Sequence, residues 1–279
     1  MFAIDMRHRL VSRPLLLLLF CVLALSSRVA VGQPAASASP QRTLLAVFAH
    51  PDDETIAGPL LAHYANTPNT RVFIAIVTNG EKGVTPFAGI PAGEQLVAVR
   101  AKEATCACAE LGAQPPILLG FPDGGLASLQ TFAAATARLE TLLGEIKPDA
   151  IVTWGPDGGY GHADHRLVSA MVTELVQAGD TTARLYYAGL PKSRLQSDAV
   201  KEMRFPALFK GVLDDVLNVR VPYTASDASR ARKSLACHAS QFTPETMAML
   251  SKLTEQIQAG QMHLRHWTGG AARTDVFDR

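Results

Sequence analysis

Two clusters of histidine and acidic residues lie far apart in the sequence, and each directly follows an apolar run. The first is His50-Pro51-Asp52-Asp53-Glu54 after Leu44–Phe48, and the second is His162-Ala163-Asp164-His165 after Ala150–Trp154. Imidazole and carboxylate groups are common zinc ligands, and a free carboxylate can act as a general base. In open α/β sheets, ligands bind at the edge where strands end. The two clusters therefore predict one zinc site with a carboxylate base beside it, and metal-assisted hydrolysis as its chemistry.

Within each cluster, two candidate ligands are three residues apart. These are His50 and Asp53 in the first cluster, and His162 and His165 in the second. An imidazole and a carboxylate from the first cluster, with one nitrogen from the second, would give three protein ligands. A catalytic zinc ion has such a set and keeps a fourth position for water. Acidic residues at a helix N-terminus would explain the carboxylates alone, but not the first histidine together with the distant pair.

Further motifs extend this pattern along the chain. They are Arg100-x-x-Glu103, Leu119–Gly124, the Tyr160-Gly161 pair ahead of the second cluster, and His238–Gln241. In order and spacing, from Leu44 to Gln241, the chain resembles the PIG-L/LmbE-like zinc-dependent N-deacetylases. These enzymes remove acetyl groups from substrates that contain N-acetylglucosamine. The family usually has proline where this chain has Ala163, a change that leaves the ligands in place.

The resemblance implies a metal centre with one zinc ion per chain. His50, Asp53 and His165 would bind the ion. Asp52 would be the general base that acts on the metal-activated water.

The resemblance also assigns residues around this centre. His162 would stabilise the oxyanion and protonate the leaving amine, and Asp164 would orient it or raise its pKa. Tyr160 would donate to the carbonyl oxygen of the tetrahedral intermediate. Arg100 and Asp123 would line the substrate pocket. Two structural alternatives stay open: Arg100 could pair with the glutamate three residues on, and Asp123 could serve the turn of its Pro-Asp-Gly sequence.

The remaining histidines have weaker signals. His238 lies near a predicted helix end, where a core or capping role fits as well as a catalytic one. His63, His263 and His266 are expected at the surface.

Strand-like and helix-like segments alternate through most of the chain. Predicted strands are Leu44–Phe48, Val72–Val77, Ile117–Leu119, Ala150–Thr153, Leu185–Ala188 and Val212–Val221. Predicted helices are Glu54–Ala65, Glu94–Leu111, Leu129–Ile146, Ala163–Gln177, Ala225–Ala239 and Pro244–Ala259. Repeated β-then-α units predict an α/β fold: a Rossmann-like, mostly parallel sheet with helices on both faces, in a single domain over 43–279. No G-x-G-x-x-G sequence follows the first strand, so a dinucleotide site has no support.

The first 32 residues have the pattern of a secretory signal peptide. Arg7, Arg9 and Arg13 precede the apolar run Leu15–Leu25, and small residues follow. A membrane anchor is the alternative, but the run is shorter than the roughly 20 residues that span a bilayer. We expect cleavage after Gly32, a flexible lead-in over 33–42, and a protein exported to the periplasm or secreted.

The composition of the mature chain excludes some partners. The leader holds four of the 26 basic and one of the 25 acidic residues, which leaves 22 against 24. A net charge near −2 does not favour nucleic acid as a partner, and no later apolar run is long enough to span a membrane.

Three cysteines remain in the mature chain: Cys106, Cys108 and Cys237. In an oxidising compartment they allow one disulfide and one free thiol. Cys237 could pair with either of the others, whereas a bridge between Cys106 and Cys108 is not expected.

The sequence thus predicts an exported zinc hydrolase that removes an N-acetyl group from an N-acetylglucosamine-type sugar or glycoconjugate. A zinc hydrolase of the same fold that acts on another amide or an ester is the alternative enzyme. A carbohydrate-binding relative without activity is the alternative of another class, but binding alone needs no general base. The substrate itself and the oligomeric state stay open.

Overall fold

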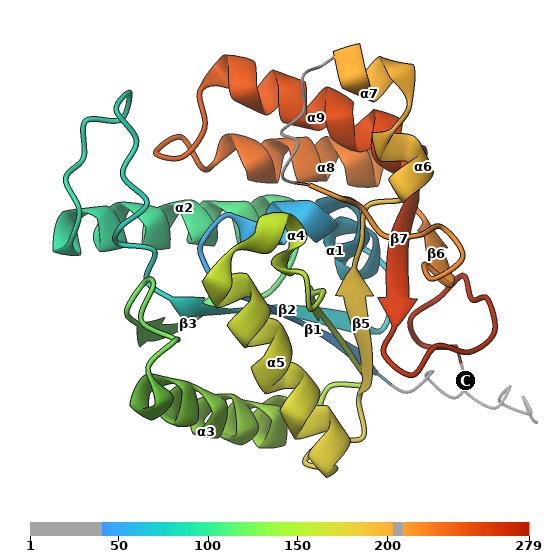
Figure 1. The fold of residues 1–279 in the computed structure, drawn as a ribbon, viewed down its shortest axis with the longest axis horizontal. Coiled ribbons are helices and arrows are strands. Elements are labelled where there is room, and N and C mark those ends of the chain that lie inside the picture. The colour runs from blue at the N-terminus through green and yellow to red at the C-terminus, as the bar shows by residue number, and fades with distance from the viewer. Residues whose placement is uncertain (1–40, 203–208, 279) are drawn as a thin grey trace, which may run out of the picture. The chain divides into compact units, whose positions relative to one another are not determined.

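A seven-stranded sheet lies at the centre of the computed structural model, which describes residues 41–202 and 209–278 (Figure 1). In these residues the strand order is β3-β2-β1-β4-β5-β7-β6. The strands are β1 (Arg42–Phe48), β2 (Thr70–Thr78), β3 (Ile117–Phe121), β4 (Ala150–Trp154), β5 (Arg184–Ala188), β6 (Val219–Pro222) and β7 (Gln261–His266). Strands β1 to β5 are parallel, and β7 runs antiparallel to both of its neighbours. The predicted Rossmann-like, mostly parallel sheet is confirmed.

The central strand β1 is apolar throughout because both of its faces are covered. Leu44, Ala46 and Phe48 belong to the core on one side, and Leu45 and Val47 belong to the core on the other. Strands buried on both faces read as continuous apolar runs rather than alternating ones. This burial fixes the strand whose end carries the first cluster.

Helices form a layer on each side of the sheet. They are α1 (Gly58–Ala65), α2 (Glu94–Leu111), α3 (Leu129–Ile146), α4 (Gly158–Gly161), α5 (Ala163–Ala178), α6 (Lys192–Leu195), α7 (Asp198–Glu202), α8 (Ala225–Ala236) and α9 (Pro244–Gln258). Helices α3 and α5 cover one face, and α1 and α2 cover the other (Figure 1). Helix α8 packs on both α1 and α2, and α9 packs on α8.

Local signals in the sequence set the helix ends. Helix α2 ends at Gly112, whose φ of 83° closes the helix in the left-handed conformation that glycine favours. Ser128 caps α3 by accepting from the backbone N–H of Thr131. The predicted bounds of α2 and α3 are both confirmed.

Two predicted elements differ from the structure, and one strand was not predicted. The helix expected from Glu54 begins instead as a 3-10 turn (Asp53–Ala57), and α1 follows it. The strand expected over Val212–Val221 is reduced to β6, because the chain turns at Asp214, whose carboxylate accepts from the backbone N–H of Ser193. Strand β7 was missed because its sequence is rich in polar residues.

A disulfide joins Cys106 in α2 to Cys237 at the end of α8, and Cys108 is a buried free thiol. The expected absence of a Cys106–Cys108 bridge is confirmed. The leader and most of the lead-in lie outside the described residues. Among the helices of the described part, none is long and apolar enough to cross a membrane.

Candidate metal centre and active site

The two clusters meet at the point where the strand order changes direction. The chain passes from β1 outward to β2 and β3, and then returns to place β4 on the other side of β1. Because β1 and β4 are parallel neighbours, the residues that follow them lie at the same edge of the sheet. This is the position where open α/β sheets bind ligands.

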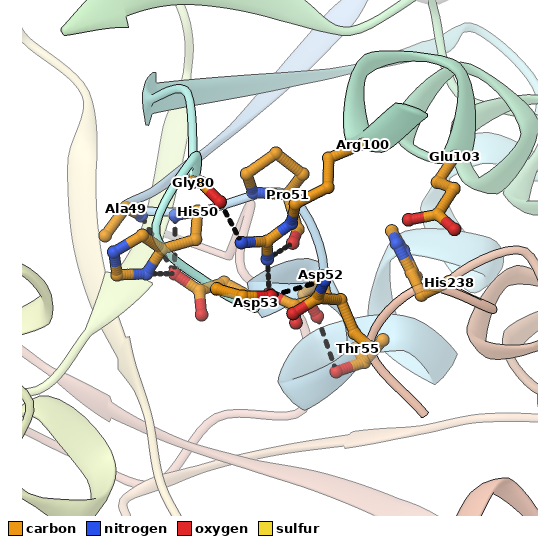
Figure 2. Close-up of polar contacts among 12 residues, drawn as sticks. Ala49, His50, Pro51, Asp52, Asp53, Thr55, Gly80, Arg100, Glu103 and His238 are labelled. Atoms are coloured by element: carbon orange, nitrogen blue, oxygen red, sulfur yellow. Dashed lines mark hydrogen bonds and ion pairs between the residues drawn. The ribbon is translucent and has the colours of Figure 1, made fainter. Parts of the chain in front are cut away.

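The turn after β1 folds around the carboxylate of Asp53. Its Oδ2 accepts from the backbone N–H groups of Ala49 at 3.0 Å and His50 at 2.9 Å (Figure 2). Trp154, the last residue of β4, donates its indole N–H to the same oxygen at 3.2 Å. Three donors hold one oxygen, so the orientation of Asp53 is fixed and Oδ1 is directed at His165 Nε2, 3.0 Å away.

Donor atoms of three residues converge on one point, and they are His50 Nδ1, His165 Nε2 and the two carboxylate oxygens of Asp53. His50 Nδ1 lies 3.2 Å from His165 Nε2 and 3.5 Å from Asp53 Oδ2. Two ligands about 2.0–2.1 Å from a tetrahedral zinc ion are about 3.3 Å apart. The observed spacings of 3.0–3.5 Å match this value. The structure therefore brings the three expected metal ligands together.

The opposite nitrogen of each histidine faces an oxygen atom, and this indicates the tautomer. His165 Nδ1 faces the carbonyl oxygen of Gly158 at 3.2 Å, and the His165 ring stacks on Trp154. His50 Nε2 lies 3.2 Å from Asp123 Oδ1 and 3.4 Å from Asp164 Oδ2. With these nitrogens protonated, His50 Nδ1 and His165 Nε2 keep their lone pairs for a metal. Metal-binding histidines usually have such acceptors behind them.

Two other groupings also place donor atoms close together. One is His50 with His162 and His165, and the other is His50 with Asp123 and Asp164. The second uses His50 Nε2, the nitrogen that the tautomer argument assigns to a proton. We prefer the set of His50, Asp53 and His165. Its donor atoms have the spacing of ligands around a tetrahedral ion, and three N–H groups hold the Asp53 carboxylate in place.

The electrostatics of this site favour a cation. Burial opposes a charge on His50, but hydrogen bonds to Asp123, Asp164 and Asp53 outweigh it and raise the pKa of His50 to about 12. Burial alone would raise the pKa of Asp53, yet His165 and His50 bring it well below its usual range. The carboxylates thus draw positive charge to this point. A divalent ion would supply that charge with both histidines neutral.

Asp52 lies beside this centre in an unusual backbone conformation. Its φ is 110°, a left-handed value that costs a non-glycine residue about 1–3 kcal/mol. Glu54 Oε2 accepts from the backbone N–H of Asp52 at 3.1 Å, and the Thr55 hydroxyl donates to its C=O at 2.7 Å. Burial and the charge of Asp53 outweigh the effect of Arg100 and raise the pKa of Asp52 to about 6. Such a carboxylate is ionised at neutral pH and can still accept a proton.

Arg100 positions the Asp52 turn. Its guanidinium lies 3.0 Å from Asp52 Oδ1 and donates to the carbonyl oxygens of Gly80 and Pro51 (Figure 2). The alternative pairing with Glu103 is wrong, because that carboxylate accepts from the backbone and hydroxyl of Ser240. Contact of Arg100 with substrate stays a prediction. Its side chain is 3% exposed.

His238 belongs to a buried pair that the sequence did not reveal. Its ring is 0% exposed, and its Nε2 lies 2.5 Å from Glu54 Oε1. Because Glu54 also accepts from the N–H of Asp52, His238 acts on the Asp52 turn from a distant part of the chain. For His238 the structure favours the core role over the catalytic one. In the sequence, the one available sign of this pair is that Glu54 of the first cluster occurs together with His238 near the end of the chain.

Asp164 acts on the pKa of His162 in the expected direction, but it does not decide that pKa. The Asp164 carboxylate accepts from the backbone N–H of Gly124 at 2.7 Å and faces His50. Burial and the charges of His165 and His50 outweigh Asp164, so the pKa of His162 is lowered rather than raised. His162 Nδ1 accepts from the backbone N–H of Asp164.

Tyr160 and Asp123 lie on two sides of the centre. The Tyr160 ring is 38% exposed and packs edge-on against both His162 and His165. Burial and the nearby charge of Asp53 raise the pKa of Tyr160, which keeps its hydroxyl protonated. Asp123 accepts from the backbone N–H of Lys82 and faces His50, one of the expected metal ligands. Contact of Asp123 with substrate stays a prediction.

The remaining histidines stay partly accessible. His63 pairs with Asp227, and His263 and His266 lie on β7, all three partly exposed.

Similar proteins point to one family. The PIG-L family, described as GlcNAc-PI de-N-acetylase, matches residues 45–176. The 1D-myo-inositol 2-acetamido-2-deoxy-alpha-D-glucopyranoside deacetylase of Rhodococcus opacus (strain B4) is 32% identical over 247 residues, covering 73% of this chain and 82% of that protein.

Two solved structures share the fold. N,N'-diacetylchitobiose deacetylase from Pyrococcus horikoshii has a TM-score of 0.61 at 18% identity, covering 81% of this chain and 83% of that one. The 4-carboxy-2-hydroxymuconate hydratase from Pseudomonas putida KT2440 has a TM-score of 0.59 at 16% identity, covering 81% and 96%. At such identities these likenesses concern the fold alone. The match of the family over residues 45–176 and the similarity to the Rhodococcus deacetylase, together with the motifs and the site, show that this chain belongs to the PIG-L family.

Proposed function

We propose that the protein is a zinc-dependent hydrolase that removes an N-acetyl group from an N-acetylglucosamine-type sugar or glycoconjugate. The observation that carries this proposal is the convergence of His50, Asp53 and His165 on one point, with Asp52 beside them. The family match and the acetamido sugar named for the Rhodococcus relative support the substrate class.

Zinc is the metal that this donor set fits best. Two imidazoles and one carboxylate, with room for a further ligand, are typical of catalytic zinc. When bound, one ion per chain would polarise the carbonyl group and lower the pKa of a water molecule.

Two residues would act on the attacking water and on the carbonyl oxygen. Arg100 holds Asp52 Oδ1, which leaves Oδ2 to take a proton from the water. The Tyr160 hydroxyl, protonated at neutral pH, would donate to the oxygen that becomes negative. Removing such a donor typically costs about 2.7–4 kcal/mol of transition-state stabilisation.

His162 would serve the leaving amine. Because its Nδ1 accepts from a backbone N–H, the proton of the neutral ring is on Nε2, from which it would form a hydrogen bond to the oxyanion or to the leaving nitrogen. The proton that the leaving nitrogen gains would be the one that Asp52 takes from the water. In the overall reaction, the hydroxyl of water joins the acyl carbon and the C–N bond breaks. The nitrogen gains a proton, and acetate and an amino sugar are released.

The alternatives are tested by one assay. The fold also occurs in a hydratase, and a fold does not determine a reaction. Purified zinc-loaded protein should release acetate from N-acetylglucosamine, its oligomers or its glycosides, whereas Asp52→Asn should do so about 10²–10⁴-fold more slowly. Asp180→Asn, at an exposed position, is the matched control. Release of another acid or alcohol would favour the alternative enzyme, and binding without turnover would favour the inactive relative.

Export to the periplasm or the medium is part of the proposal. The leader motivates it, and the Cys106–Cys237 disulfide supports an oxidising compartment. N-terminal sequencing of exported protein should begin near Gln33. Detergent-dependent retention with an intact N-terminus would favour an anchor.

A further inference from the structure

A large apolar cavity opens beside the catalytic residues. Its volume is about 410 Å³. Asp52, Asp53 and Tyr160 line one end, and the rest lies between α1, α8 and α9. Most of its wall is apolar, and representative lining residues are Pro59, Ala228, Leu235, Phe242, Leu250 and Leu253.

The cavity is far larger than the proposed acetyl group requires. Ligand pockets in proteins measure about 300–1,000 Å³. An apolar cavity of only about 150 Å³ already binds benzene and excludes water. The wall therefore favours a hydrocarbon group of several carbons, and a lone methyl group would leave most of the space unfilled.

The catalytic groups indicate which part of a substrate faces the cavity. The proposed base Asp52 and the proposed oxyanion donor Tyr160 line it, whereas His162 does not. A side chain such as His162 that serves the leaving nitrogen lies next to that nitrogen and its sugar. The acyl substituent is on the opposite side of the carbonyl carbon, which is the side of the cavity.

We propose that this space, the acyl cavity, binds the hydrocarbon chain of an N-acyl group longer than acetyl, so that the enzyme prefers amino sugars with medium-chain N-acyl groups. This inference rests on the proposed function. The reaction stays balanced in the same way: water adds to the acyl carbon, the C–N bond breaks, the nitrogen gains a proton, and a fatty acid is released with the amino sugar.

The test is a chain-length series on one sugar. N-acetyl-, N-butanoyl-, N-hexanoyl- and N-octanoylglucosamine are compared by amine release from the zinc-loaded full chain. Each buried methylene can add up to about fourfold, and we expect kcat/KM to rise at least about tenfold from acetyl to octanoyl. Octyl glycosides of N-acetylglucosamine test the other end of the substrate. A flat or falling series overturns the inference, as does a gain confined to the octyl aglycone.

Cavity variants make the assignment specific. Ala228→Trp fills the cavity, and Leu250→Asn keeps the side-chain size but adds polarity; each should bring the octanoyl-to-acetyl ratio towards one. Ala236→Trp lies on the exposed side of the same helix α8 and should keep the wild-type ratio. Equal ratios in all variants contradict the proposal.

Failure of the proposed function can be told apart from failure of this inference. Acetate release with a flat series leaves the deacetylase and removes the acyl cavity. If no amide is cleaved, calorimetry with the same compounds decides the inference. Tighter binding of N-octanoyl- than of N-acetylglucosamine, lost in Ala228→Trp, supports it, and equal binding overturns it.

Discussion

Replacing His238 by alanine should destabilise the domain strongly. The ring is fully buried, and its loss leaves the Glu54 carboxylate, whose side chain is 2% exposed, without its partner. Removing one member of a buried pair costs about 3–5 kcal/mol. In a domain of this size each kcal/mol lowers Tm by about 2–4 °C, so the expected fall is about 6–20 °C by calorimetry.

The same variant should lower turnover without removing the metal. Glu54 holds the backbone N–H of Asp52, whose left-handed φ needs support. Because a misplacement of about 1 Å can cost about 100-fold, we expect kcat to fall by up to that factor. KM and zinc content should stay close to wild type, since neither Glu54 nor His238 belongs to the metal set.

The effect on stability should also depend on pH. Burial opposes the charge on His238, but Glu54 outweighs it and raises the pKa above its usual value of 6.5. The stabilisation from the charged ring is therefore complete below pH 6.5 and is lost as pH rises through the raised pKa. The difference in unfolding free energy between wild type and His238→Ala should narrow at alkaline pH.

His63→Ala is the matched control for this prediction. His63 also pairs with an aspartate, Asp227 at 3.4 Å, but its side chain is 31% exposed, and exposed pairs contribute about 0–1 kcal/mol. Equal losses of stability in the two variants would refute the reasoning. Loss of zinc from His238→Ala would show that the pair supports the metal centre rather than the base.

Three further predictions concern the catalytic residues and the disulfide. The kcat/KM profile should fall on the acid side near pH 6, where Asp52 gains a proton, and an acid limb that persists unchanged in Asp52→Asn would contradict this. His165→Ala should bind zinc weakly and recover partly in excess metal, whereas His162→Ala should keep zinc and stay slow at every concentration; metal analysis beside rate measurements separates the two. Reducing the Cys106–Cys237 bond, which closes a loop across 131 residues, should cost about 5 kcal/mol by the loop-entropy relation, and an unchanged Tm in reductant would count against it.

Much of the fold could be predicted from patterns among residues that are close together in the sequence. Continuous apolar runs predicted the parallel strands, and glycine or proline signals predicted the ends of α2 and α3. Strand β7 escaped because a polar sequence became a strand only through pairing with β5 and β6. The break at Asp53 escaped because it depends on a side chain that folds back onto Ala49 and His50.

The metal ligands were easier to predict than their surroundings. His50 and Asp53 follow β1, and His165 stands at the start of α5, so their spacing marks them as candidate ligands, and the resemblance to the family then selects His165 over His162. The partners of Arg100 and His238 depend on contacts between distant segments, which spacing does not encode. The orientation of the Asp164 carboxylate could not be predicted for the same reason, because its contacts are with Gly124 and His50, which belong to other loops.

The central claim is that one carboxylate of the first cluster binds the metal and its neighbour is the base. Zinc stoichiometry of purified Asp53→Ala and Asp52→Asn, measured beside acetate release, tests this directly. The account predicts that Asp53→Ala lacks zinc, and that Asp52→Asn holds one ion per chain but loses about 10²–10⁴-fold in rate. A metal-free Asp52→Asn, or a fully loaded Asp53→Ala, would contradict it.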